Sequence, residues 1–167
     1  MEKSVSTCAI LTVSDKGSRG ERRDTSGPQL QRQLADAGFQ VVATAVVPDQ
    51  PELIRQAIIR WVDEERIDLI ITTGGTGVSP SDRTPEATRE LLDLEIPGIG
   101  EAMRMASFAK TPNAVLSRGL AGIRKESLII NLPGSEKAAR ENLEVVLPAL
   151  HHAVYKIKGG AKDCAAC

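Results

Sequence analysis

The sequence predicts an α/β fold with three layers, in which a mostly parallel central sheet is flanked by helices. Two observations support this prediction. Short apolar segments rich in β-branched residues alternate along the chain with longer segments whose apolar residues recur at helical spacing. In addition, residues 68–73 (DLIITT) form a short apolar strand candidate of the kind found where helices cover both faces of a sheet.

The strand candidates are separated by polar or glycine-containing loops. The first, STCAILTVS, is followed by Asp-Lys-Gly, and the last, SLIINL, is followed by Pro-Gly-Ser. The predicted strands are residues 6–14, 39–47, 68–73, 113–117 and 127–132. Residues 118–125 fit either a β-ribbon or an extended loop.

Helices are predicted between these strands. Leu30 and Leu34 share one helical face, and residues 51–65 present one wide apolar face. Thr84 followed by Pro85 indicates a helix start, because Thr caps helices and Pro fits the first turn. The helix candidates are residues 29–37, 51–65, 84–94, 97–109 and 135–158, the last with a possible kink at Pro148.

Composition narrows the class of protein. The chain has 167 residues, which favours one domain, expected over residues 1–158, with a flexible tail over residues 159–167. A net charge of -1 argues against binding to bulk nucleic acid or anionic membranes. No apolar run approaches the roughly 18 residues that span a bilayer, so we expect a cytoplasmic protein. Cys8 fits the core, whereas Cys164 and Cys167 fall in the tail.

The unusual loops follow apolar strands. Asp15, Asp49, residues 74–82 and residues 133–135 come after the first, second, third and last of these strands. Ligands of parallel sheets bind at the carboxyl ends of the strands. We therefore expect these four segments to converge on one edge of the sheet.

A glycine-rich loop is the most specific motif. Thr73, Gly74, Gly75, Thr76 and Gly77 combine backbone freedom with hydroxyl donors, and successive N–H groups in such a loop bind anions. The alternative is a purely structural turn from strand to helix. The loop matches neither the dinucleotide fingerprint nor the P-loop, which requires Gly-Lys-Ser/Thr.

Two acids accompany this loop. Asp82 follows Gly77 by five residues, and Asp49 lies between a strand and a helix. Each fits a helix cap, but each also fits a Mg²⁺ site, since that ion takes one or two carboxylates together with substrate phosphates.

Later in the chain, Ser117 and Arg118 place a hydroxyl and a phosphate-binding fork near a strand, although loop cations are often only solvated. Pro133, Gly134 and Ser135 precede the last helix. Ser135 fits its N-cap, and that helix N-terminus is a potential anion site.

Taken together, these segments resemble the MogA family of molybdenum-cofactor biosynthesis, over about residues 6–158. The order and spacing of the motifs carry the resemblance. These motifs are TTGGTG at 72–77, SDRTPEAT at 81–88, PG at 97–98, LSRG at 116–119, AGIR at 121–124 and LPGS at 132–135. Ser81 departs from the family, which often has Arg before the Asp.

The resemblance implies a molybdenum-cofactor-binding-like fold, a homotrimer and a reaction in which molybdopterin and ATP give adenylyl-molybdopterin and pyrophosphate with Mg²⁺. It implies that Asp49 and Asp82 bind the metal and serve catalysis, with a weaker expectation for Asp15. The expected phosphate-binding and substrate-binding residues are Thr73, Gly74, Gly75, Thr76, Gly77, Ser117, Arg118, Pro133, Gly134 and Ser135. The product is expected to pass to a molybdate-insertion enzyme.

Other functions remain open at this stage. A MoaB-type relative would share the fold and the chemistry. A molybdate-insertion enzyme would need further domains. A carrier or scaffold module would bind the pterin without turnover, and a nucleotide-binding regulator would bind ATP without dependence on pterin. Asp49 and Asp82 favour the enzyme, because a pure binder has no need for both acids.

Overall fold

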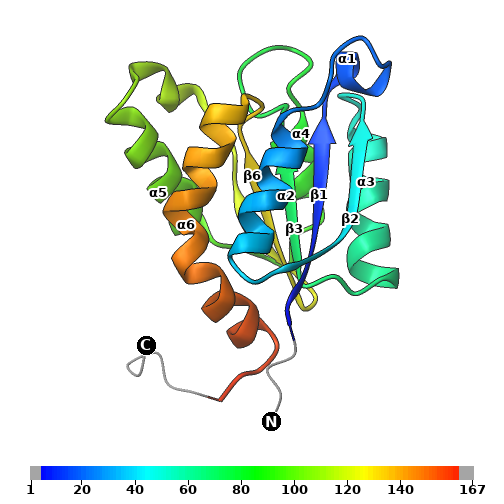
Figure 1. Cartoon of the computed structure of the whole chain (residues 1–167), viewed down its shortest axis with the longest axis vertical. Coiled ribbons are helices and arrows are strands. Elements are labelled where there is room, and N and C mark those ends of the chain that lie inside the picture. Colours follow the sequence, from blue (N-terminus) through cyan, green and yellow to red (C-terminus); the bar gives the residue numbers. More distant parts are fainter. Residues whose placement is uncertain (1–4, 162–167) are drawn as a thin grey trace.

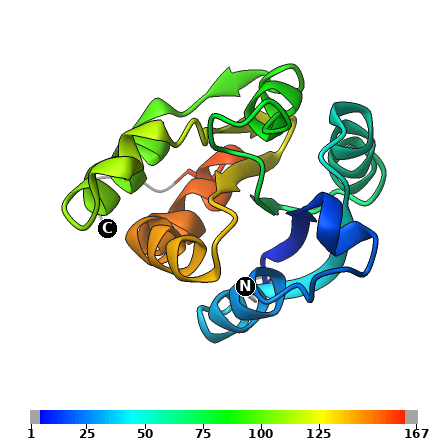
Figure 2. The ribbon, with the colours of Figure 1, turned by 90° about the horizontal axis from the view of Figure 1, so that it is seen from above.

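The computed structural model of the chain describes residues 5–161 and has three layers (Figure 1). A six-stranded sheet forms the middle layer, with strand order β2-β1-β3-β6-β5-β4. Helices lie on both faces of the sheet (Figure 2). This arrangement confirms the predicted fold class. Cys164 and Cys167, and with them most of the predicted tail, lie outside the described residues.

Five of the six strands of this sheet point the same way, and β5 runs in the opposite direction. β1 pairs in parallel with β2 and β3, β3 pairs in parallel with β6, and β5 is antiparallel to both of its neighbours. The strands are β1 (Thr7–Val13), β2 (Gln40–Val47), β3 (Leu69–Thr73), β4 (Leu94–Glu95), β5 (Ala121–Arg124) and β6 (Ser127–Leu132).

The helices divide into two groups, one on each face. The helices are α1 (Asp15–Ser18), α2 (Ser26–Asp36), α3 (Pro51–Ile59), α4 (Thr84–Arg89), α5 (Pro97–Phe108) and α6 (Glu136–Ile157), with a π-helical turn η1 (Arg60–Glu64) and a 3₁₀ helix η2 (Pro112–Leu116). Side chains of α2, α5 and α6 join one buried cluster, and side chains of α3, η1 and α4 join the other.

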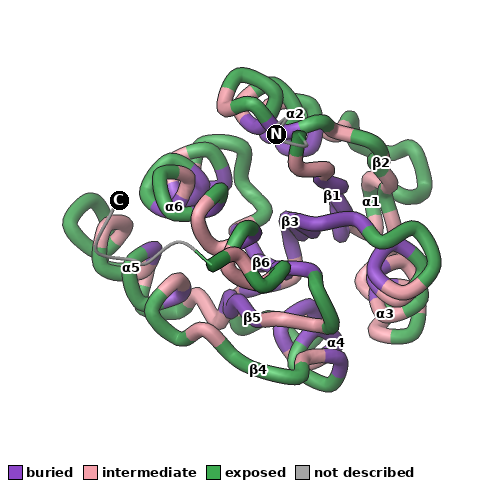
Figure 3. Tube along the Cα trace, turned by 90° about the horizontal axis from the view of Figure 1, so that it is seen from below, coloured by how far each residue is buried: buried purple, intermediate pink, exposed green. Residues whose placement is uncertain are grey.

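β1 shows how the sequence builds both cores. Successive side chains of a strand point to opposite faces. Cys8 and Ile10 therefore enter the cluster beneath α2 and α6, whereas Ala9 and Leu11 enter the cluster beneath α3. Figure 3 shows the resulting buried centre along β1, β3 and β6. Among the described residues, no helix has the length and apolar character needed to cross a membrane.

One predicted strand is wrong. Residues 113–116 of the predicted strand 113–117 belong to η2, because Pro112 sets the backbone of the first helical turn and the Thr111 hydroxyl accepts a hydrogen bond from Asn113 N at 3.4 Å. Val115 and Leu116, which suggested a strand, are exposed.

The other differences concern element boundaries. α4 ends at Arg89, five residues before the predicted end, because the chain then turns to pair β4 with β5. Thr84, predicted to cap that helix, is instead its first residue, and Arg83 is the N-cap residue. Residues 121–132 form a β-hairpin, so the β-ribbon alternative is confirmed for residues 121–124. The last helix continues through Pro148.

Candidate functional site

The loops that follow the four parallel strands meet at one edge of the sheet. Val13 pairs with Val47, Thr12 pairs with Thr73, and Thr73 pairs with Leu132, so the strands end almost level with one another. Figure 2 looks onto this edge, where α1 and the loop after β3 lie. The expected convergence of the four segments on one edge is therefore found.

Asp15 and Asp49 bind each other's backbone at this edge. Asp15 N donates to Asp49 Oδ2 at 2.9 Å, and Asp49 N donates to Asp15 Oδ1 at 2.9 Å. Ser14 supports the pair, since its N–H donates to Val47 O at 2.9 Å and its hydroxyl caps α1. Asp49 is therefore held by the loop after β1. It does not cap α3, whose N-cap is Gln50.

The electrostatics of Asp49 place it near a second acid. Partial burial raises the pKa of Asp49 above its ordinary value, and the negative charges of Asp15 and Asp82 raise it further. The hydrogen bond from Asp15 N opposes these effects. The Asp49 carboxylate thus lies in the negative field of two further acids, and this field favours the approach of a cation.

The glycine-rich loop requires its first two glycines. Gly74 has a φ of 104°, and a Cβ there would overlap the Val13 carbonyl. Gly75 has a φ of 65°, and a Cβ there would overlap the Thr84 hydroxyl and lie 3.1 Å from Asp49 Oδ1. Gly75 thus leaves open the space between the loop backbone and the Asp49 carboxylate.

The segment after β6 packs against the same loop. The Thr73 hydroxyl donates to Pro133 O at 2.6 Å, and a Cβ on Gly134 would lie 3.2 Å from Gly74 Cα. Ser135 caps α6, as expected, by accepting a hydrogen bond from Ala138 N at 3.3 Å. Thr73 and Thr76 are both buried, so their side chains shape the loop from within.

Asp82 closes a short exposed turn after the glycines. Asp82 N donates to Ser79 O, and Ser79 N donates to Asp82 Oδ2, both at 2.9 Å. The carboxylate lies beside Gly77, where a Cβ would come within 2.9 Å of Asp82 Oδ2. Asp82 is thus held by its own loop at the end of the glycine-rich segment.

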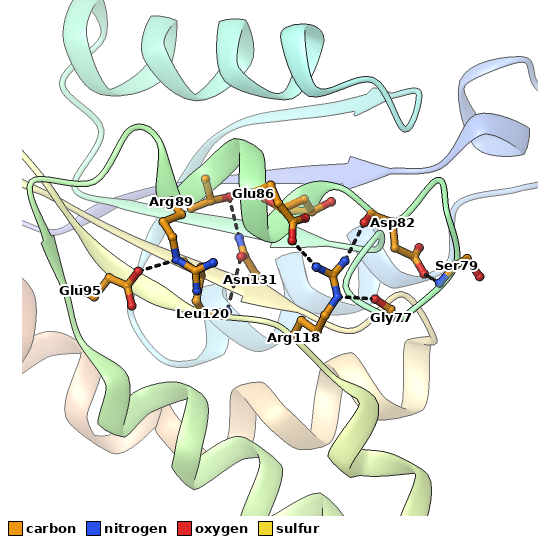
Figure 4. A network of polar contacts seen from close by, with 11 residues as sticks. Gly77, Ser79, Asp82, Glu86, Arg89, Glu95, Arg118, Leu120 and Asn131 are labelled. Atoms are coloured by element: carbon orange, nitrogen blue, oxygen red, sulfur yellow. Dashed lines mark hydrogen bonds and ion pairs between the residues drawn. The ribbon is translucent and has the colours of Figure 1, made fainter.

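Ser117 and Arg118 line a cavity of about 360 Å³ beside this turn. The Arg118 guanidinium donates to Gly77 O and Asp82 O and forms an ion pair with Glu86 (Figure 4). The cavity walls come from α4, α5 and the segment leading into β5. The lining residues are Pro85, Glu86, Arg89, Glu95, Pro97, Gly100, Arg104, Ser117, Arg118, Gly119, Leu120 and Ala121.

Sequence reasoning missed three polar residues near the site. Asn131 is fully buried and donates to Thr72 Oγ1 and Thr88 Oγ1, both at 2.9 Å. Its signal was a lone amide within the apolar run SLIINL. Thr84 Oγ1 is buried without a hydrogen-bond partner beneath Gly75. Glu86, which the sequence offered only as a member of the motif at 81–88, pairs with Arg118.

The donor set fits Mg²⁺. Among residues 5–161, no three His, Cys, Asp or Glu side chains gather closely enough to form a cation cage by themselves. Mg²⁺ does not need such a cage, because it takes one or two carboxylates together with substrate phosphates and water. Asp49 lies beside Gly75 and Asp82 lies beside Gly77, so the two carboxylates border the glycine-rich loop and are donors of that kind.

The fold and this edge define an α/β protein in which a glycine-rich loop and paired carboxylates lie together at the ends of parallel strands. The model of one family, described as a probable molybdopterin binding domain, matches residues 9–152. The chain belongs to this family.

Known relatives agree with this assignment. Molybdopterin adenylyltransferase of Helicobacter pylori strain J99 is 44% identical over 152 residues, which cover 90% of this chain and 86% of the relative. The crystal structure of the molybdopterin biosynthesis enzyme MoaB from Thermus thermophilus is 56% identical, with a TM-score of 0.87, and the match covers 92% of this chain and 96% of that one. Molybdenum cofactor synthesis protein cinnamon of Drosophila melanogaster is 44% identical, but the match spans 25% of its length.

Proposed function

We propose that this protein is a molybdopterin adenylyltransferase, which converts molybdopterin and ATP to adenylyl-molybdopterin and pyrophosphate. The observation that carries the proposal is that two carboxylates border the glycine-rich loop, since a Cβ on Gly75 would lie 3.1 Å from Asp49 Oδ1 and a Cβ on Gly77 would lie 2.9 Å from Asp82 Oδ2. The name of the Helicobacter pylori relative, and the match over most of its length, support the same reaction.

The reaction is a transfer of an adenylyl group between phosphates. An oxygen of the molybdopterin phosphate attacks the α-phosphorus of ATP, and a new P–O bond forms. The bond from the α-phosphorus to the bridging oxygen breaks, and pyrophosphate leaves with the electron pair. Such transfers depend on positioning and charge neutralisation and need no covalent nucleophile from the protein.

The residues of the sheet edge supply those functions. We assign the backbone N–H groups of residues 75–77 to the ATP phosphates, because a glycine-rich loop at a strand end presents such donors. Gly74 N already donates to Leu132 O at 3.1 Å, so this residue serves the turn itself. Residues 133–135 form the adjoining wall, and the N-terminus of α6 adds a favourable dipole there. We assign the cavity beside Ser117 and Arg118 to molybdopterin.

Asp49 and Asp82 would hold the Mg²⁺ ion. A bound cation neutralises charge on the transferring phosphate oxygens. Asp15 fixes Asp49 through the reciprocal hydrogen bonds described above, so the Asp49 carboxylate keeps one orientation at the loop.

The remaining partners belong to the same proposal. The adenylylated product passes to a molybdate-insertion enzyme, and the protein works in the cytoplasm, where ATP is available. The free thiol of buried Cys8 suits a reducing compartment. We also propose a homotrimer, supported by an apolar surface on α5 and η2 formed by Met105, Phe108, Val115 and Leu116, all of them exposed.

An adenylation assay tests the reaction. Purified protein is mixed with molybdopterin, ATP and Mg²⁺, and pyrophosphate and adenylyl-molybdopterin are followed, with controls lacking pterin or metal. We expect product that depends on both. Asp82→Asn should retain pterin binding and lose turnover, because the amide oxygen still accepts from Ser79 N while the charge is lost.

Asp93→Asn is the matched control. Asp93 also accepts a backbone hydrogen bond, from Lys125 N at 2.7 Å, but lies outside the site. Turnover should therefore persist in this variant. Tight pterin binding without product from the wild-type protein would favour a carrier or scaffold module. Normal turnover in Asp82→Asn would remove Asp82 from the metal site.

A further inference from the structure

Arg118 joins both ends of the turn that carries Asp82. Its Nε donates to Gly77 O at 2.7 Å, and its Nη2 donates to Asp82 O at 2.6 Å. Its backbone N–H donates to Thr76 O at 2.8 Å. One residue therefore contacts the chain just before, at the start of and at the end of the segment 77–82 (Figure 4).

The turn itself has few other anchors. Residues 78–81 are all exposed, so no core packing fixes them. The two hydrogen bonds between Ser79 and Asp82 close the turn internally, but they do not attach it to the sheet. The attachment comes from the Arg118 side chain and, beyond the turn, from Thr84 N, which donates to Gly75 O at 3.1 Å.

Glu86 orients the guanidinium. It contacts Arg118 Nη1 from the first turn of α4. Burial raises the pKa of the Glu86 carboxyl, but the hydrogen bond from its own backbone N–H and the contact with Arg118 together lower the pKa below its ordinary value. A guanidinium is planar and offers its donors in a fixed fork. With one arm on Glu86, the other donors are aimed at Gly77 O and Asp82 O.

We infer that Arg118 is a positioning residue, which holds residues 77–82 so that the Asp82 carboxylate faces the glycine-rich loop. The inference rests on the adenylyl transfer proposed above and replaces the expectation that Arg118 is itself a phosphate ligand. In the structure its Nε, Nη1 and Nη2 all contact protein oxygens. A phosphate would have to compete with these charge-assisted hydrogen bonds.

The test distinguishes a positioning role of Arg118 from a role as a phosphate ligand. Hydrogen exchange of residues 77–83 is measured by mass spectrometry without substrates, for wild type, Arg118→Gln and Arg118→Lys. We expect exchange to rise about tenfold in both variants, as the loss of charge-assisted hydrogen bonds predicts. Lys should not rescue, because a single ammonium group cannot span three acceptors.

Two further variants keep the test sharp. Glu86→Gln leaves the guanidinium in place but removes its ionic partner, so exchange of the same segment should rise less. Arg104→Gln is the matched control, because Arg104 lines the same cavity and donates to Gly119 O at 2.8 Å without contacting the turn. Exchange of residues 77–83 should stay unchanged in this variant.

Steady-state kinetics then show whether Arg118 acts on the metal site or on molybdopterin binding. In Arg118→Gln we expect a lower kcat and about a tenfold rise in the Mg²⁺ concentration that gives half-maximal rate, with little change in the KM for molybdopterin. A merely destabilised fold would not separate these quantities in this way.

Two results would overturn the inference. The first is unchanged exchange of residues 77–83 in Arg118→Gln. The second is faster exchange accompanied by a raised KM for molybdopterin and an unchanged Mg²⁺ requirement, which would make Arg118 a substrate ligand. Exchange is measured without substrates, so it tests the positioning role of Arg118 even if the wild-type protein is inactive. Inactivity of the wild-type protein would count against the proposed function alone.

Discussion

Asp15 and Asp49 lie 34 residues apart in the chain and exchange two hydrogen bonds, each from the backbone N–H of one to the carboxylate of the other. The arrangement fixes the loops after β1 and β2 to each other. It also brings two negative charges together, which costs free energy in the absence of a cation. The arrangement of acids at this edge therefore lowers the stability of the ligand-free protein.

Asp49→Asn should stabilise the metal-free protein at pH 7 while abolishing adenylation. The side-chain amide oxygen introduced at this position can still accept from Asp15 N, but the charge is gone. Burial, followed by the charges of Asp15 and Asp82, raises the folded-state pKa of Asp49. The wild-type carboxylate therefore begins to cost stability as pH rises above the ordinary Asp pKa of about 3.9, and the full cost is present above the folded pKa.

The measurement is urea unfolding of both proteins in EDTA at pH 7 and pH 3. The gain from Asp49→Asn should be present at pH 7 and vanish at pH 3, where the carboxyl is protonated in both states. If the difference in unfolding free energy between Asp49→Asn and wild type were the same at pH 7 and pH 3, the Asp49 charge would carry no electrostatic cost in the folded protein.

Asp63→Asn should show the opposite dependence on pH. Arg124 donates to both carboxylate oxygens of Asp63, at 2.9 and 2.7 Å, and lowers the pKa of that carboxyl, with Lys125 contributing. A lowered folded pKa stabilises the protein above the ordinary Asp pKa, and this stabilisation is lost as pH falls through the folded value. The variant should therefore lose stability at neutral pH, by at most about 1 kcal/mol.

Chemical unfolding from pH 7 down to pH 2 measures this difference, which should shrink toward zero at the acid end. Glu95→Gln is a suitable comparison, because the Arg89–Glu95 pair is more exposed and should contribute less. If the loss of stability stayed constant across the pH range, its cause would be packing of the hairpin against η1, and the charge of Asp63 would not contribute.

The sequence was informative wherever local pattern decides structure. Apolar periodicity identified the buried strands, and the Thr73–Gly77 motif located the loop at the end of β3. It misled at residues 113–117, where β-branched and apolar residues outweighed the helix-starting signal of Pro112. Propensity there gave no information on whether a sheet would cover Val115 and Leu116.

The contacts that shape the site were beyond local pattern. Arg118 was recognised as a cation near a phosphate site, but two of its acceptors are backbone carbonyls about 40 residues away, which no residue type reveals. Asp15 was only a weak candidate, because its partnership with Asp49 depends on strand register. Convergence of the loops could be expected from the parallel sheet, whereas the pairing of individual side chains could not.

Gly75→Ala should disrupt the loop through two separate effects. The position has a φ of 65°, a conformation that costs a residue with a Cβ roughly 1–2 kcal/mol. The new methyl group would also overlap the Thr84 hydroxyl and crowd Asp49 Oδ1. We expect loss of stability and of ATP-dependent turnover.

Gly20→Ala separates the two effects. Gly20 has a similar φ of 73°, but no atom lies within 4 Å of a Cβ placed there. It should lose only the conformational part of the stability and keep its turnover. If the two variants behaved alike in unfolding and adenylation experiments, crowding at the Asp49 carboxylate would play no part.

The apolar surface on α5 and η2 should govern assembly. Met105 is 75% exposed and Phe108 is 56% exposed, and α5 packs against η2, which carries Val115 and Leu116. Contiguous exposed apolar side chains of this kind mark interaction sites on otherwise polar surfaces. Phe108→Glu would place a charge in a trimer interface at this surface, so the variant should dissociate, as measured by light scattering after size exclusion.

Val42→Glu is the matched control, because Val42 is 45% exposed on β2, at the opposite edge of the sheet from β4 and β5. A trimer that survives Phe108→Glu and dissociates with Val42→Glu would move the interface to β2, and a monomeric wild-type protein would remove the trimer altogether.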